Sequence, residues 1–131
     1  MRKFLIVDDE PGILKLLSAI LLEEGFQVQT ACNGLEALAA LQQEKGWVVL
    51  LDLMMPRFNG YEVLQQLRNQ PQLRDANVIV LMSAGADLQE AGPLLMQGEV
   101  QALLPKPFDL FKVLTLAEQL ADQPAISNSA V

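Results

Sequence analysis

The order of apolar segments constrains the fold more than any other feature of this sequence. Five short apolar runs alternate with five longer segments whose apolar residues recur at helical spacing. Strands that alternate with helices of this length form right-handed crossovers and a parallel sheet covered on both faces. The sequence therefore predicts an α/β domain of five βα units, with buried strands at residues 3–7, 27–31, 47–51, 78–82 and 102–104.

The segments between these strands carry signals of helix ends. Asn33 followed by Glu36 resembles a capping box, and Asp109 can cap the last helix. Gly92 and Pro93 together disfavour a regular start of the fourth helix, which we expect to begin late or to be irregular. The helices are expected at residues 11–24, 34–45, 61–69, 88–97 and 110–121.

Composition and charge narrow the function classes. A chain of 131 residues favours one domain, expected at residues 1–122 with a flexible tail at residues 123–131. The net charge of -7 repels a phosphate backbone, so direct nucleic-acid binding is not expected. Apolar runs of about five residues are far shorter than the roughly 20 that cross a bilayer. Without such a run, and with Cys32 as the only cysteine, we expect a cytoplasmic protein without membrane insertion.

Polar side chains stand where four of the five predicted strands end. Asp8 and Asp9 follow the first strand, Asp52 ends the third, Ser83 ends the fourth and Lys106 follows the fifth. Ligands of an open parallel sheet bind beyond the carboxyl ends of its strands. Any one of these residues alone would be an ordinary solvated loop residue. Together they would bring three carboxylates, a hydroxyl and an ammonium to one edge.

This combination suits phosphoryl transfer. Three clustered carboxylates repel one another unless a cation intervenes, and oxygen ligands of this kind suit Mg²⁺, or Mn²⁺ in its place. Asp52 can act as a nucleophile that accepts a phosphoryl group and forms an acyl phosphate. The transfer needs alignment and neutralisation of the equatorial oxygens, to which Lys106 and Ser83 would contribute. The sequence thus predicts a phosphoaccepting site that needs no His or Cys.

Four short strings, taken in order, resemble the receiver domain of bacterial two-component response regulators. The resemblance extends over about residues 3–121. It implies a flavodoxin-like fold with helices on both faces of a sheet of order 2-1-3-4-5. The strings are Val7-Asp8-Asp9-Glu10, Asp52-Leu53-Met54-Met55-Pro56 with Gly60, Leu81-Met82-Ser83-Ala84, and Pro105-Lys106-Pro107-Phe108.

The resemblance implies a role for each acidic residue. Asp52 would be the phosphoacceptor. Asp9 and Asp52 would bind the metal directly, and Asp8 would bind it largely through water. The backbone carbonyl of Met54 would complete the protein's ligands.

The resemblance also implies how the phosphoryl group is sensed. Lys106 would contact the group, aimed by a cis bond to Pro107, and Ser83 would swing towards it as the switch hydroxyl. Three residues before the lysine the family usually carries Tyr or Phe, but this chain has Leu103. Two interpretations stay open: leucine fills the same apolar pocket by drift, or the signal passes through loop and helix movement without an aromatic side chain.

We therefore expect a stand-alone receiver, not an enzyme, that is phosphorylated by a sensor histidine kinase or a histidine phosphotransfer protein. Phosphorylation would change its affinity for an unidentified protein target, and the protein would be a monomer or a weak homodimer. Three alternatives remain: the receiver segment of a longer regulator, an interaction module that has lost phosphorylation, and a haloacid-dehalogenase-type phosphatase. Those phosphatases usually carry a second Asp where this chain has Met54.

Overall fold

The strands form one parallel sheet in the order β2-β1-β3-β4-β5. The structure is a computed structural model that describes residues 3–121, apart from the side chains of residues 85–88. The observed order confirms the predicted α/β class and the sheet order that the resemblance implied. The strands are β1 (Lys3–Val7), β2 (Val28–Ala31), β3 (Trp47–Asp52), β4 (Val78–Ala84) and β5 (Ala102–Lys106).

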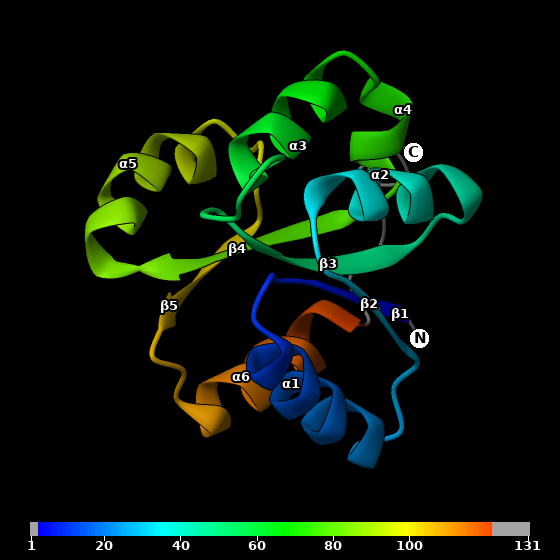
Figure 1. Ribbon diagram of the computed structural model, residues 1–131, viewed down its shortest axis with the longest axis vertical. Helices are drawn as coiled ribbons and strands as arrows, with labels where there is room; N and C mark the ends of the chain where they lie inside the picture. The colour runs from blue at the N-terminus through cyan, green and yellow to red at the C-terminus, as the bar shows by residue number, and fades with distance from the viewer. Residues whose placement is uncertain (1–2, 122–131) are drawn as a thin grey trace.

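Helices cover both faces of the sheet (Figure 1). Asp109 caps the last helix as predicted, because its Oδ1 accepts a hydrogen bond of 3.0 Å from the Phe111 amide. On one face lie α1 (Pro11–Glu23) and α6 (Leu110–Ala121). On the other face lie α2 (Gly34–Gln43), α3 (Gly60–Arg68), α4 (Pro71–Asp75) and α5 (Gly85–Met96).

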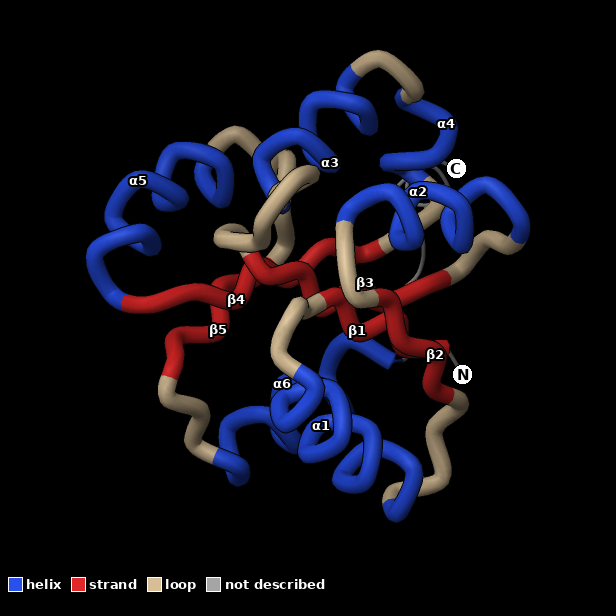
Figure 2. The backbone as a smooth tube through the Cα atoms, in the orientation of Figure 1, coloured by secondary structure: helices blue, strands red, loops and turns tan. Residues whose placement is uncertain are grey.

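The strands bury both of their faces, which explains their nearly continuous apolar sequences. Successive strand side chains point to opposite sides, so Leu5 and Val49 join the core beneath α2, α3 and α5, while Phe4 and Val48 join the core beneath α1 and α6. All six residues of β3 are buried. Figure 2 shows the strands side by side between the two helical layers.

The fourth predicted helix begins earlier than expected, so the predicted start near residue 88 was wrong. The observed α5 starts at Gly85 and continues through Gly92 and Pro93. Gly92 has no Cβ to clash with the proline ring. The carbonyl that loses its helical partner belongs to Gln89, an exposed residue, so water can solvate it. These two conditions let the proline sit inside the helix.

The sequence analysis missed the short helix α4. Pro71 occupies its first turn and Leu73 buries its apolar side chain. The buried Asn77 then joins this turn to the sheet: its amide donates to the Leu73 carbonyl at 2.6 Å and its oxygen accepts from the Trp47 amide at 2.8 Å. The local signals that could have predicted this helix were the proline at its start and one apolar leucine.

The predicted capping box at Asn33 forms only in part. The Asn33 side chain accepts from the Glu36 amide at 2.9 Å, but the Glu36 carboxylate accepts from the Cys32 amide at 3.1 Å. A reciprocal capping box forms instead at Asn59 and Glu62, where both hydrogen bonds are 3.0 Å long. Both α2 and α3 therefore begin at well-anchored asparagines.

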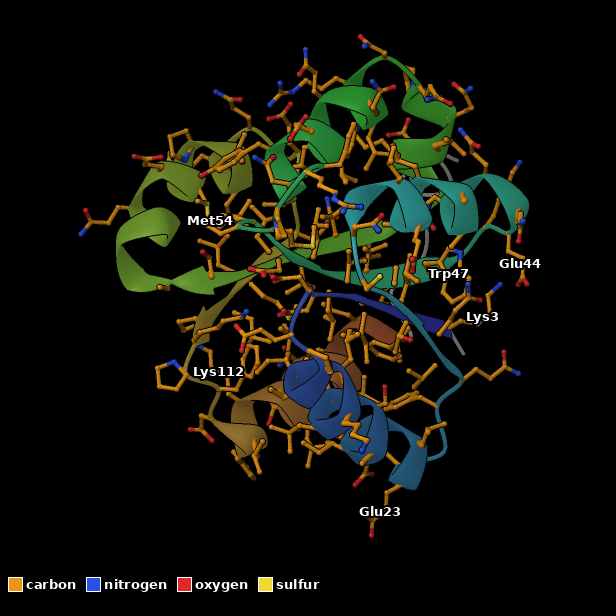
Figure 3. The ribbon with its side chains drawn as sticks, viewed as in Figure 1. Lys3, Glu23, Glu44, Trp47, Met54 and Lys112 are labelled. Atoms are coloured by element: carbon orange, nitrogen blue, oxygen red, sulfur yellow. The ribbon has the colours of Figure 1, made fainter. Side chains whose placement is uncertain are left out.

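The end of the sheet opposite Met54 holds the tryptophan of this chain (Figure 3). The Lys3 ammonium lies 4.4 Å from the centroid of the buried Trp47 ring and forms an ion pair with Glu44. No helix within residues 3–121 has the length and apolar character to cross a bilayer. The predicted flexible tail at residues 123–131 lies outside the described residues and stays a prediction.

Candidate functional site

The carboxyl ends of β1 and β3 bring three acidic side chains together. These strands are neighbours in the sheet, with Val7 beside Leu51 in register, so the residues that follow emerge side by side. One carboxylate oxygen from each of Asp8, Asp9 and Asp52 lies within 4.8 Å of the other two. The structure thus gathers the three acidic residues that the sequence placed at strand ends.

The three carboxylates differ in environment. Asp8 is fully buried and Asp52 is 3% exposed, whereas Asp9 is exposed. Hydrogen bonds hold both oxygens of Asp8: Oδ1 accepts from the Glu10 amide at 2.9 Å, and Oδ2 accepts from the Lys106 ammonium at 2.7 Å. Asp8 is therefore a fixed part of the site, while Asp9 is exposed to solvent.

Lys106 joins the cluster from β5, 98 residues away from Asp8 in the chain. Its Nζ lies 2.7 Å from Asp8 Oδ2 and 3.5 Å from Asp52 Oδ2. Burial alone would lower the pKa of Lys106, but the hydrogen bond that it donates to Asp8 and the charges of Asp52 and Asp8 raise it. The bond between Lys106 and Pro107 is cis, as the resemblance implied. The lysine thus contributes a permanent positive charge to the site.

One lysine does not balance the buried negative charge. Burial, followed by the charge of Asp8, raises the pKa of Asp52 to about 6. Lys106 and the Met54 amide, which donates to Asp52 Oδ1 at 3.4 Å, oppose this rise. Mg²⁺ prefers carboxylate oxygens as ligands, and this cluster needs more positive charge than Lys106 supplies. The donor set present here fits a divalent cation.

Ser83 stands between the strands of Asp52 and Lys106. It is buried and lies within β4, which continues to Ala84, two residues beyond the predicted strand end at Met82. Its register neighbour on β5 is Pro105, directly before the lysine. On the other side, β4 places Met82 beside Asp52. Ser83 therefore lies on the strand between those that carry Asp52 and Lys106.

Met54 and Leu103 lie at the margins of the site. Met54 is 57% exposed and lies where the chain turns away from Asp52. Leu103 is partly buried, packs against the core beneath α2, α3 and α5, and lies beside Leu81 in register. The leucine thus fills an apolar place next to the strand that carries Ser83.

A hollow of about 460 Å³ adjoins the lysine, between the start of α1 and the segment after β5. The sequence analysis did not anticipate this hollow, because its walls come from opposite ends of the chain. Its lining is mostly apolar and includes two charged residues. The lining residues are Glu10, Ile13, Leu16, Lys106, Pro107 and Phe108.

The fold is that of a doubly wound α/β protein, and its charged site lies at the carboxyl ends of the strands. The chain matches the family model of the response regulator receiver domain over residues 4–118. It belongs to this family and is a receiver domain of two-component signalling. The resemblance found in the sequence is confirmed, and it favours a signalling domain over a dehalogenase-type phosphatase.

Curated relatives are longer regulators. The chain is 42% identical over 109 residues to the transcriptional regulatory protein CpxR homolog of Haemophilus influenzae, which covers 83% of this chain and 45% of that protein. It is 33% identical over 129 residues to the response regulator Rre1 of Synechocystis, covering 96% of this chain and 54% of that protein. The chain thus spans about half the length of these relatives.

Solved receiver structures share the fold. The chemotaxis response regulator CheY4 of Vibrio cholerae is 28% identical, with a TM-score of 0.79 over 92% of this chain and 98% of that one. The response regulator TrrA of Thermotoga maritima, solved in complex with Mg²⁺ and BeF, is 32% identical, with a TM-score of 0.75 over 92% of this chain and 99% of that one.

Proposed function

We propose that Asp52 accepts a phosphoryl group in a cation-dependent reaction, and that the phosphorylated domain changes its affinity for a protein partner. One observation carries this proposal: the buried Asp52 carboxylate lies both within the acidic cluster and 3.5 Å from the Lys106 ammonium. A nucleophile, a cation site and a fixed positive charge are the groups that phosphoryl transfer to a carboxylate needs.

The residues that would hold Mg²⁺, or Mn²⁺ in its place, are Asp9, Asp52 and the Met54 carbonyl. Asp8 would act largely through water, which agrees with its full burial and with the hydrogen bond that each of its oxygens already accepts, from the Glu10 amide and from Lys106. A bound divalent cation neutralises phosphoryl oxygens and favours the ionised form of the neighbouring carboxylates. The solved complex of TrrA with Mg²⁺ supports this assignment by analogy.

The protein side chains would then divide the remaining work. An ionised Asp52 oxygen forms the new bond to phosphorus while the bond from phosphorus to the donor's histidine nitrogen breaks, and the bonding electrons leave with the imidazole. Lys106 neutralises one phosphoryl oxygen, and the Ser83 hydroxyl approaches another. Only the ionised carboxylate attacks, and without metal the pKa of Asp52 is about 6, so a cation that favours the ionised form would also prepare the nucleophile.

The test compares the Asp52→Asn variant with the wild type after incubation with acetyl phosphate and Mg²⁺. Intact-mass spectrometry should find one added phosphoryl group on the wild type and none on the variant. Asp75→Asn is the matched control, because Asp75 lies on α4 and pairs with Arg74. Phosphorylation of Asp52→Asn at another residue would contradict the proposal.

A histidine kinase or a histidine phosphotransfer protein is the proposed donor. The hollow beside Lys106 supports this, because the apolar residues Ile13 and Phe108 in its lining give a protein partner a surface next to the lysine that contacts Asp52. The downstream target would be captured in a pull-down that compares wild-type protein with and without beryllofluoride and Mg²⁺. Equal capture under both conditions would contradict a phosphorylation-dependent partner.

The proposed signal would leave the site without an aromatic side chain at position 103. Leu103 already packs against the core, which supports movement of loop and helix instead. Structures with and without beryllofluoride would test this. An unchanged backbone from Ser83 to Leu104 would contradict it.

A further inference from the structure

We propose that the beginning of α2 braces the loop between β3 and α3, with Gly34 as a positioning residue for the cation ligands on that loop. The loop comprises residues 53–59, between Asp52 and α3. The inference rests on the proposed function for the identity of the ligand. Its structural part, the brace, rests on contacts between two segments that are distant in the sequence.

The loop needs external support at its centre. Arg57 has a φ of 71°, a conformation that is uncommon for residues other than glycine. The Phe58 amide donates to the Pro56 carbonyl at 2.9 Å, which makes a tight reversal. Met54 has an exposed side chain, and its amide makes only a long hydrogen bond of 3.4 Å to Asp52. The position of the Met54 carbonyl therefore depends on its neighbours in the loop.

Gly34 supplies the support at the reversal. Its amide donates to the Phe58 carbonyl at 3.1 Å. A Cβ atom on Gly34 would lie 2.5 Å from Phe58 Cδ1, 2.7 Å from Phe58 O and 2.8 Å from a Val63 methyl group. Such distances are far below van der Waals contact. Gly34 is not among the glycines with positive φ, so close approach, and not backbone conformation, requires glycine here.

The brace itself is firmly held. Asn33 caps the beginning of α2 by accepting a hydrogen bond from the Glu36 amide, and the Glu36 carboxylate accepts one from the amide of Cys32, directly after β2. Figure 1 shows α2 beside α3 on one face of the sheet, so the loop that enters α3 passes the beginning of α2. A rigid helix end therefore fixes the centre of a strained loop.

A larger residue at position 34 must displace the backbone of Phe58, four residues after Met54. The displacement would move the Met54 carbonyl relative to Asp52 without touching a carboxylate. Residues that orient metal ligands from outside the coordination shell change metal affinity by about 10- to 100-fold when replaced. We expect Gly34→Ala to weaken Mg²⁺ binding by about 10-fold.

The experiment measures the Mg²⁺ Kd by isothermal titration calorimetry. It also measures backbone amide exchange of residues 54, 55 and 57–59 in the metal-free protein. Gly34→Ala should raise the Kd and speed exchange in the loop. Gly12→Ala is the matched control, because no atom lies within 4 Å of the added Cβ and the residue is on the opposite face of the sheet. It should keep the wild-type Kd and exchange.

Two further variants keep the test decisive. Phe58→Ala removes the braced ring without adding an atom, and it should also raise the Kd and speed exchange even if Gly34→Ala does not fold. Leu120→Ala weakens the core beneath α6, far from the loop, and should leave the Kd unchanged. An equal loss of affinity in Leu120→Ala would show a general effect of stability and would overturn the inference.

Failure of the brace and failure of the proposed function give different results. Wild-type Kd and exchange in both Gly34→Ala and Phe58→Ala would overturn the brace, while wild-type phosphorylation would leave Asp52 as the acceptor. A wild type that binds no Mg²⁺ would overturn the proposed function instead. The amide exchange of the loop would then still decide whether Gly34 holds it.

Discussion

Replacing Asp52 with asparagine should make the metal-free protein more stable at neutral pH. Burial and the charge of Asp8 raise the pKa of Asp52 from its ordinary value of 3.8 to about 6, so the folded protein binds this proton more tightly than the unfolded chain does. The contribution of Asp52 to the free energy of unfolding of the wild type therefore falls as the pH rises from about 4 to about 6. Asparagine cannot ionise, so the variant escapes this loss.

The size of the effect follows from the pKa. A rise from 3.8 to about 6 corresponds to about 3 kcal/mol once the pH exceeds both values. Solvent around the exposed Asp9 and rearrangement of the Lys106 side chain relieve part of the cost. We therefore expect Asp52→Asn to gain about 1 to 2 kcal/mol at about pH 8 and almost nothing at about pH 4.

Urea unfolding followed by far-ultraviolet circular dichroism would measure this difference in the presence of EDTA, from about pH 4 to about pH 8. Asp75→Asn serves as the control, since Asp75 is partly exposed and lies outside the acidic cluster. Saturating Mg²⁺ should stabilise the wild type more than the variant. Equal stability of the wild type and Asp52→Asn at about pH 8, or a difference that does not change with pH, would refute this account of the buried charge.

Three other substitutions have definite expected outcomes. Lys106→Met should abolish phosphorylation by acetyl phosphate while Mg²⁺ still binds. It should also lower the free energy of unfolding by about 3 kcal/mol at neutral pH, because Asp8 loses its buried partner. Mass spectrometry checks the first effect and urea unfolding the second, with Lys112→Met as the control. Gly60→Ala should destabilise the protein by about 3 kcal/mol in urea, because a Cβ there would lie 2.5 Å from the Asp52 carbonyl oxygen; wild-type stability would contradict this. Asn77→Ala should cost about 2 kcal/mol in thermal unfolding, since it leaves a buried backbone amide of β3 unpaired, and a loss below about 0.5 kcal/mol would speak against that hydrogen bond.

The sequence was sufficient to predict features that repeat along the chain or have local signals. The sheet could be predicted because each strand is a buried apolar run, and the site followed because parallel strands end at one edge. Asp8 and Lys106 could be expected to meet although 98 residues separate them. Their contact depends on sheet order, which the resemblance supplied.

Features that depend on how two elements pack escaped prediction. The contact between Gly34 and Phe58 has no signature in either segment, because it exists only once α2 and the loop after β3 are in place. The start of α5 was misjudged because propensity counts Gly92 and Pro93 as two penalties, whereas the glycine removes part of the proline's clash. Both the contact between Gly34 and Phe58 and the start of α5 depend on how particular residues pack together, which composition does not show.

The position of Trp47 makes its fluorescence sensitive to unfolding but not to occupancy of the acidic edge. The chain has one tryptophan, and its buried ring lies at the end of the sheet opposite Met54, beside the Lys3 ammonium (Figure 3). Its emission should therefore change when the core opens and remain flat when a cation or a phosphoryl group occupies the acidic edge. Intrinsic fluorescence would report unfolding alone, so ligand occupancy would need a second fluorophore near that edge.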